Sequence, residues 1–150
     1  MTTVTEQAAI DSNVLVALID GRDKWHGEAQ ALLAVLKGRD TGPVYFDCVL
    51  NETISVLARR AEEQGRLAQF PMLLSLLLSK VPKEIVVWIS GETQRLYDDI
   101  VDLVRESTGK LNFHDALIAL SCRELGIKTI ASFDEDFDDV LWLRRVKISS

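Results

Sequence analysis

The sequence predicts an α/β fold in which helices cover both faces of a mostly parallel sheet. Short apolar runs typical of strands alternate with longer stretches whose apolar residues recur at helical spacing. The chain has 150 residues, of which 47% are hydrophobic and 27% are charged, and these values are typical of one globular domain. No repeat, low-complexity tract or linker interrupts the pattern, so we expect a single domain over residues 1–150.

A short strand over residues 8–11 opens the pattern and leads into a helix over residues 13–19. Asp23 is of a residue type favoured at helix N-termini, and we expect it to cap a second helix that runs to about Lys37. The apolar residues between them keep the helical period. The start of the chain therefore predicts a strand followed by two helices.

After a turn at TGP, residues 44–46 predict a strand and residues 48–63 predict a helix. A further helix is expected over residues 66–79. It contains the run LLSLLL, which is more leucine than one face of a small domain needs. Because a large apolar surface usually marks an interface, we expect this helix to be buried on two sides or to take part in a homodimer interface.

Pro82 ends the leucine-rich helix, because proline lacks the N–H group that a helix requires. The run IVVWI then predicts a strand over residues 84–89, since β-branched and aromatic residues are enriched in strands. A helix is expected to follow, beginning at Ser90 or Thr93 and running to about Glu106.

The last third of the chain has clear signals for both ends of one helix. Asn112 is expected to cap it, and Gly126 is expected to stop it after Leu125. Residues 128–132 and 140–148 predict the last two strands. The acidic run DEDFDD between them predicts a turn or a short helix.

Four acidic residues occupy positions that such a sheet would bring together. Asp11 and Asp134 directly follow predicted strands, and parallel sheets bind ligands beyond the carboxyl ends of their strands. Glu52 and Asp115 lie near the front of predicted helices that can dock beside those ends. Carboxylates that share a pocket repel one another, and a divalent cation relieves that repulsion. The pattern therefore predicts a metal site, for which a phosphate backbone is the favoured substrate.

Other polar residues near these four are weaker candidates. Asp136 would support the site or bind a second metal ion. Asn13 and Ser132 would orient the carboxylates or the scissile phosphate, although helix caps or strand-end hydrogen bonds would explain them equally well. His114 need not face the same pocket as Asp115, because neighbouring residues on a helix point about 100° apart.

Bulk properties narrow the class of protein. The net charge of −6 argues against tight nonspecific binding of nucleic acid. It does not exclude a selective nuclease, because acids at a metal site lower the formal charge and basic residues cluster locally. No apolar run reaches the roughly 18 residues of a membrane span, and no secretory signal is visible. Cys48 and Cys122 have no metal-binding or CxxC spacing, so we expect buried thiols in a cytoplasmic protein.

The sequences around the four acids resemble the motifs of the PIN domain, the nuclease module of the VapC-type toxins in VapBC toxin–antitoxin pairs. IDSNVLVAL resembles the opening D-[ST]-N motif, NETISVL the helix that bears a glutamate, and HDALIAL the helix that bears the DA pair. ASFDEDFDD resembles the terminal T-x-D-x-D-F segment, with Ser132 where threonine is common. The resemblance extends from Ile10 to Asp138, with spacings of 41, 63 and 19 residues between the acids.

This resemblance implies a three-layer α/β/α fold, Mg²⁺ or Mn²⁺ as cofactor and cleavage of single-stranded RNA. It also implies that the protein is usually a homodimer, and an antitoxin protein becomes a candidate partner. Asp11, Glu52 and Asp115 would hold the metal ion, and Asp134 would bind a second ion or orient the attacking water. The sequence thus favours a metal-dependent endoribonuclease, in which Asp136 has the weaker metal-binding role and Asn13 and Ser132 lie next to the site.

Other functions are compatible with the same residues. A stand-alone PIN nuclease would process RNA or cleave DNA flaps with a similar acidic cluster. A noncatalytic RNA-binding scaffold is disfavoured, because it has no physical reason to keep clustered negative charge. A response-regulator receiver domain would have paired acids near the N-terminus and a lysine after a late strand, whereas the N-terminus here offers only Asp11.

Overall fold

The computed structural model describes residues 6–148, and its centre is a five-stranded sheet in which all the pairings are parallel. The strand order is β3-β2-β1-β4-β5, so the first strand of the chain lies in the middle. The strands are β1 (Gln7–Ile10), β2 (Gly42–Phe46), β3 (Val86–Val87), β4 (Thr129–Ala131) and β5 (Arg144–Arg145). The predicted parallel sheet is therefore confirmed.

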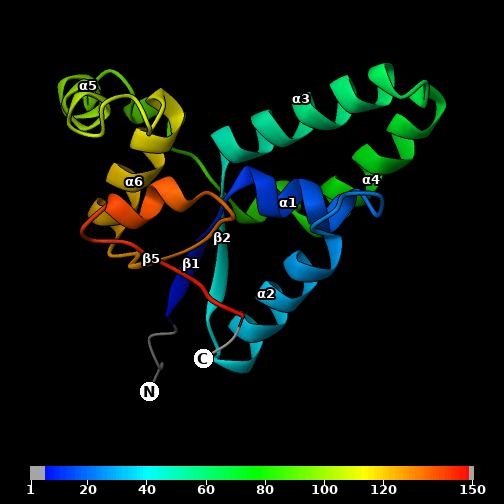
Figure 1. Ribbon diagram of the computed structural model, residues 1–150, viewed down its shortest axis with the longest axis horizontal. Helices are drawn as coiled ribbons and strands as arrows, with labels where there is room; N and C mark the ends of the chain where they lie inside the picture. Colours follow the sequence, from blue (N-terminus) through cyan, green and yellow to red (C-terminus); the bar gives the residue numbers. More distant parts are fainter. Residues whose placement is uncertain (1–5, 149–150) are drawn as a thin grey trace.

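Helices cover both faces of this sheet and make three layers (Figure 1). On one side lie α1 (Ser12–Ile19), α2 (His26–Gly38), α3 (Asp47–Glu63) and α4 (Phe70–Lys80). On the other side lie α5 (Tyr97–Glu106) and α6 (Phe113–Leu125). Short 3₁₀ turns connect several elements: η1 (Leu67–Gln69), η2 (Lys83–Ile85), η3 (Ser90–Glu92) and η4 (Glu135–Asp139). The predicted three-layer α/β/α arrangement is confirmed.

The core is built around the central strand and the helix α6. Ala8, Ala9 and Ile10 of β1 are fully buried. Because β1 has a strand on each side and helices above and below, its residues form a continuous apolar run rather than an alternating one. In α6, all seven residues 116–122 are buried. These two elements hold the carboxyl end of β1 and the start of α6 in fixed positions.

The ends of α6 lie where the sequence predicts them. The side-chain Oδ1 of Asn112 accepts a hydrogen bond from the N–H of Asp115 at 2.8 Å. Gly126 ends the helix with φ of 72°, in the left-handed region where a side chain would be strained. Local signals were sufficient here because both ends depend on residues within one turn of the helix.

The strands predicted over residues 84–89 and 140–148 are much shorter in the structure, and each keeps two residues. On the first of these edges, the Asp47 carboxylate accepts the N–H of Ile89 at 2.6 Å, which draws the chain away from the sheet. Trp88 is 68% exposed as a result. On the other edge, Leu141 is 98% exposed before β5 begins. Edge strands are commonly short, which limits pairing with other chains.

Three predicted helix starts are wrong by several residues. α2 begins at His26 because the carboxylate of Asp23 accepts the N–H of Trp25 at 2.7 Å and also binds Arg60. The leucine-rich helix begins at Phe70, after the 3₁₀ turn η1. The helix expected from Ser90 or Thr93 begins only at Tyr97, because the preceding residues form η3 and a turn.

Within residues 6–148, none of the helices is both long enough and apolar enough to span a bilayer.

Candidate active site

Asp11 lies at the carboxyl end of β1 and is 5% exposed. It caps α1, because its Oδ1 accepts the N–H of Ser12 at 2.8 Å. Its Oδ2 accepts the hydroxyl of Ser132 at 2.6 Å. Both carboxylate oxygens are therefore held, and the side chain has a fixed orientation without a basic partner in residues 6–148. Asp11 is thus a helix cap, and it remains a candidate site residue.

The hydroxyl of Ser132 connects the ends of β1 and β4. It donates to Asp11, and it accepts the side-chain N–H of Asn13 at 3.3 Å and the backbone N–H of Asp134 at 3.0 Å. Asn13 in turn accepts the N–H of Phe133 at 3.1 Å. A hydroxyl has one proton and two lone pairs, so the hydrogen-bonding capacity of Ser132 is fully used. This network fixes the segment that carries Asp134 against the segment that carries Asp11.

Glu52 and Asp115 complete a set of four carboxylates that influence one another, which we call the acid group. Burial, together with the charges of Asp11, Asp134 and Glu52, raises the pKa of Asp115 to about 7. Burial likewise raises the pKa of Asp11 to about 6, although its two hydrogen bonds oppose the change, and Glu52 and Asp134 add to it. The structure thus brings the four predicted acids into one electrostatic neighbourhood.

Asp134 and Asp136 lie at the rim of this neighbourhood. The Oδ1 of Asp134 accepts the N–H of Asp136 at 2.9 Å and caps η4. Partial burial and the charge of Asp134 raise the pKa of Asp136, and the charge of Lys110 opposes that change. Asp136 therefore lies next to the acid group without belonging to its centre, and its predicted role stays a prediction.

The acid group fits a divalent cation by its chemistry. Its donors are carboxylate oxygens, which Mg²⁺ and Mn²⁺ prefer, and none of the four pairs with a basic side chain in residues 6–148. In the structure, no three His, Cys, Asp or Glu side chains within residues 6–148 lie close enough together to hold a metal ion. Two features explain the spread: Glu52 is exposed on α3, and Asp134 is turned toward η4. Mutual repulsion favours the same separation.

Two neighbours of the site were missed at the level of the sequence. The guanidinium of Arg145 donates to the carbonyl oxygen of Ser132 at 3.3 Å, which places a cation beside the acid group. The rings of Trp25 and Phe133 pack with their centroids 4.8 Å apart, so a partly exposed aromatic pair includes the residue that precedes Asp134 in the chain. The basic cluster near Arg145 was visible in the sequence, but its contact with Ser132 depends on the pairing of β4 with β5.

Comparisons with known proteins agree with this geometry. The PIN domain family matches residues 8–143. Among solved structures, VapC20 of Mycobacterium tuberculosis, a toxin described as cleaving the sarcin-ricin loop, superposes with a TM-score of 0.68 at 22% identity, covering 91% of this chain and 96% of that one. VapBC2 of Rickettsia felis, crystallised with a DNA fragment from its promoter, gives 0.66 at 15% identity over 93% and 97% of the two chains. No curated protein matches the sequence. The family match covers most of the chain, and the chain therefore belongs to the PIN domain family.

Proposed function

We propose that this protein is a metal-dependent endoribonuclease that cleaves single-stranded RNA and acts as the toxin of a toxin–antitoxin pair. The observation that carries the proposal is the acid group at the carboxyl end of a PIN-domain sheet, where burial and mutual repulsion raise two pKa values and none of the four acids forms an ion pair within residues 6–148. A noncatalytic domain would gain stability by losing these charges. Catalysis gives a reason to keep them.

The acid group (Asp11, Glu52, Asp115 and Asp134) would hold Mg²⁺ or Mn²⁺. Asp136 is a weaker candidate for a further ligand. When bound, the ion supplies Lewis-acid polarisation of the phosphate and lowers the pKa of a water molecule. The carboxylate of Asp11 would offer the ion a ligand of fixed orientation, because Ser12 and Ser132 hold both of its oxygens. Glu52 is exposed and therefore has the rotamer freedom to move toward a ligand.

Ser132 and Asn13 position the acids instead of reacting. Their hydrogen bonds tie the backbone at Phe133 and Asp134 to the end of β1, so a shift of either residue would move two carboxylates relative to each other. His114 is exposed, and the Nδ1 of His26 lies 2.6 Å from the carbonyl oxygen of Ala17. The chain therefore supplies no histidine pair for acid–base cleavage through the RNA 2′-hydroxyl, and we expect hydrolysis by water.

The direct test is cleavage of a labelled single-stranded RNA with Mg²⁺ or Mn²⁺ and with EDTA. We expect cleavage that requires the metal ion, with 5′-phosphate and 3′-hydroxyl product ends, and its loss in Asp11→Asn. Products that end in a 2′,3′-cyclic phosphate, or cleavage that EDTA leaves unchanged, would contradict the proposal. A DNA strand and a DNA flap of the same sequence belong in the assay, because faster cleavage of either would favour the stand-alone nuclease alternative.

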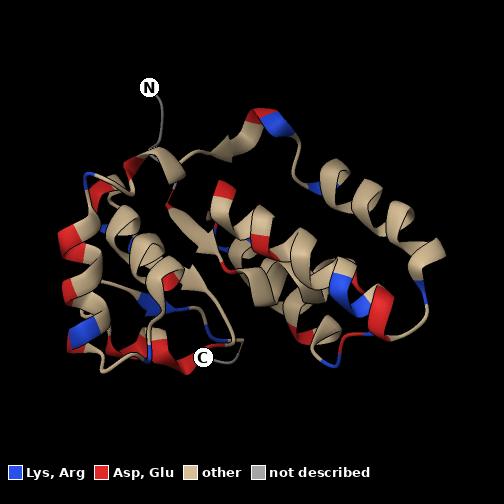
Figure 2. Cartoon of the chain, turned by 90° about the horizontal axis from the view of Figure 1, so that it is seen from above, with Lys and Arg blue, Asp and Glu red and all other residues tan. Residues whose placement is uncertain are grey.

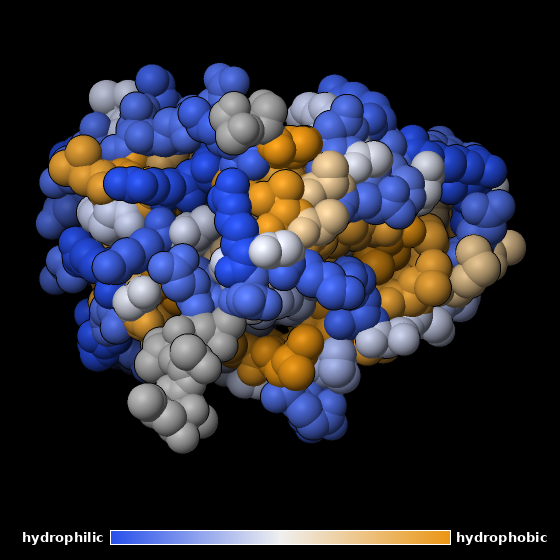
Figure 3. Space-filling view, turned by 90° about the horizontal axis from the view of Figure 1, so that it is seen from below, coloured by the Kyte–Doolittle hydropathy of each residue, from blue (hydrophilic) through white to orange (hydrophobic). Residues whose placement is uncertain are grey.

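We further propose that the protein forms a homodimer in the cytoplasm, as a single domain over residues 1–150, and binds an antitoxin protein. The structural similarity to VapBC2 supports the antitoxin partner. α4 carries no acidic residue, and its one basic residue is Lys80 at its end (Figure 2). Met72, Leu76 and Leu78 are all about half exposed or more, and an apolar area is visible on the side of the molecule where α4 lies (Figure 3). Such an area favours a protein interface.

The position of this interface is testable at α4. Leu77 is 0% exposed, so a charge there would disrupt the core and could not report on an interface. Leu76 is exposed one residue earlier, and Leu76→Glu leaves the core intact. We expect light scattering to show a dimer for the wild-type protein and a monomer for Leu76→Glu, with Leu125→Glu as the control, because Leu125 is 53% exposed on α6, on the other side of the sheet. A wild-type monomer would contradict the homodimer, whereas a dimeric variant would exclude only this face.

A further inference from the structure

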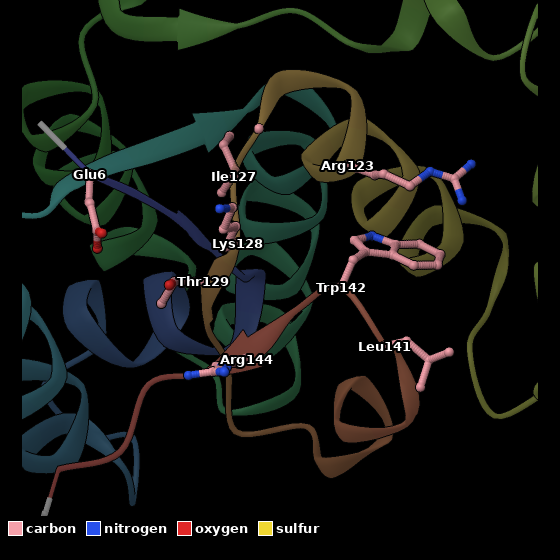
Figure 4. Close-up of a pocket in the computed structure, with 9 residues that line it drawn as sticks. Glu6, Arg123, Ile127, Lys128, Thr129, Leu141, Trp142 and Arg144 are labelled. Atoms are coloured by element: carbon pink, nitrogen blue, oxygen red, sulfur yellow. The ribbon is translucent and has the colours of Figure 1, made fainter. Parts of the chain in front are cut away.

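Two hollows of about 560 and 600 Å³, both lined by basic side chains, adjoin at Thr129 and Arg144, where β4 and β5 begin. Figure 4 shows the first hollow, in which Lys128 and Arg144 lie near Thr129 and Arg123 lies beside Trp142. We call the two hollows together the basic groove; its cationic residues are Arg39, Arg123, Lys128, Arg144, Arg145 and Lys147.

The charge in the basic groove is largely uncompensated. The acidic residues in its lining are Glu6 and Asp138, and Asp138 is paired with Arg145 at 2.8 Å. None of the other five cations forms an ion pair within residues 6–148. This concentration occurs in a chain whose net charge is −6. Clefts lined by one sign of charge raise the local concentration of the opposite ion, so the groove suits an anionic ligand.

Arg145 connects the basic groove to the acid group. Its guanidinium lies in the lining of the groove and also donates to the carbonyl oxygen of Ser132, whose hydroxyl holds Asp11. β4, which separates the two regions, has three residues, and a strand rises roughly 3.3 Å per residue, so its ends are about 10 Å apart. One RNA strand can span that distance within a few nucleotides.

We propose that the basic groove binds the phosphate backbone of RNA outside the cleavage site, so that the protein selects RNAs long enough to reach both regions. This inference rests on the proposed ribonuclease function. The cations are divided between the linings of the two hollows, which suits a chain of phosphates better than a single anion. Trp142 and Leu141 add apolar surface to the lining, as single-stranded nucleic acid sites commonly do.

The test compares two double variants with the same loss of charge. Lys128→Gln with Lys147→Gln alters the basic groove, and Lys80→Gln with Lys83→Gln alters the end of α4 and η2; all four lysines are exposed. Fluorescence anisotropy of a long single-stranded RNA is measured in EDTA, which keeps the RNA intact. We expect the groove variant to bind on the order of tenfold more weakly near 0.1 M salt, with a salt slope smaller by about 1.4 for two lost phosphate contacts. The control should bind as the wild type does.

Measurements of RNA cleavage distinguish a failure of the groove proposal from a failure of the proposed ribonuclease function. With Mn²⁺, a short RNA that covers only the cleavage site should be cut equally by the wild type and both double variants, while the groove variant should have a raised KM for the long RNA. Equal binding by both variants, or displacement of RNA by poly-glutamate at the same charge concentration, would overturn the assignment to RNA. Groove-dependent binding without cleavage by the wild type would instead overturn the proposed function and leave the groove as an RNA site.

Discussion

Two buried groups of aspartates in this molecule meet opposite electrostatic conditions. Asp20 and Asp23, between α1 and α2, have side chains that are 4% and 7% exposed, and Arg60 contacts them at 3.4 and 2.7 Å. Arg66 lies 3.9 Å from the same Oδ2 of Asp20 that Arg60 contacts. Asp11 is equally buried, yet its neighbours are carboxylates, and burial raises its pKa to about 6.

The difference separates acids that the chain pairs with its own arginines from acids that we propose to bind a metal ion. Arg60 and Arg66 already compensate the charges of the first group. Asp11 receives only hydrogen bonds from Ser12 and Ser132, and we propose that a cation compensates its charge. The comparison predicts opposite responses of the two groups to substitution, pH and metal.

The largest expected effect is on catalysis. Asp115→Asn removes a charge and a proposed metal ligand at the start of α6, and we expect RNA cleavage to fall by about 100-fold or more, since even groups that only support ligands change activity by 10–100-fold. Asp102→Asn is the control, because Asp102 is exposed on α5 and pairs only with Arg105. Cleavage rates with saturating Mn²⁺ decide the matter, and full activity in Asp115→Asn would remove this residue from the site.

The second effect is on the arginine-compensated group. Asp20→Asn leaves Arg60 and Arg66 with weaker partners, and we expect the free energy of unfolding to fall by about 2–4 kcal/mol, given that Arg60 is one-third exposed. In metal-free protein, Asp11→Asn should raise the free energy of unfolding, because it removes repulsion among the carboxylates of the acid group. Urea unfolding of both variants in EDTA makes the comparison. Destabilisation of the same size in both would show that the two groups do not differ.

The sequence predicted the elements whose signals are local. Asn112 and Gly126 lie next to the helix ends that they determine, so both were found. The extents of β3 and α2 were not, because they depend on Asp47 binding Ile89, 42 residues away, and on Arg60 binding Asp23, 37 residues away. A single sequence carries no record of such pairs.

The same reasoning applies to the site. The four acids could be predicted because their positions at strand ends and helix starts follow from the topology alone. The contact of Arg145 with Ser132 could not, since it required the length and partner of an edge strand of two residues. Whether the acids bind metal stays a prediction, and their raised pKa values give it a second test.

The third effect concerns pH. The folded protein holds protons on Asp11 and Asp115 up to a pKa of about 6 and about 7, whereas both ionise near 3.8 when unfolded. The folded state therefore binds more protons between these values, so the stability of metal-free protein should rise as the pH falls, by about 3–4 kcal/mol from about pH 7 to about pH 5, and the gain is complete only below the unfolded pKa. Asp11→Asn with Asp115→Asn serves as the reference, and the difference between the two curves isolates these groups.

Metal should change that pH dependence. Saturating Mn²⁺ favours the charged carboxylates, so the stability gained on acidification should shrink or reverse in the wild type and stay unchanged in the double variant. A metal-free wild-type curve that parallels the double variant would contradict the raised pKa values.

The smallest expected effect lies in the hydroxyl of Ser132, which is 2% exposed. Ser132→Ala leaves the Oδ2 of Asp11 without its donor and Asp134 without its acceptor, so we expect a loss of about 1–2 kcal/mol in stability and roughly tenfold in cleavage. Because this hydrogen bond lowers the pKa of Asp11, its loss should also move the acidic limb of the pH–rate profile to higher pH.

Ser121→Ala is the matched control, since the hydroxyl of Ser121 is buried with no partner in the described chain. Ser132→Thr should restore both stability and the profile. If Thr and Ala at this position behave alike, Ser132 fills space and does not position Asp11.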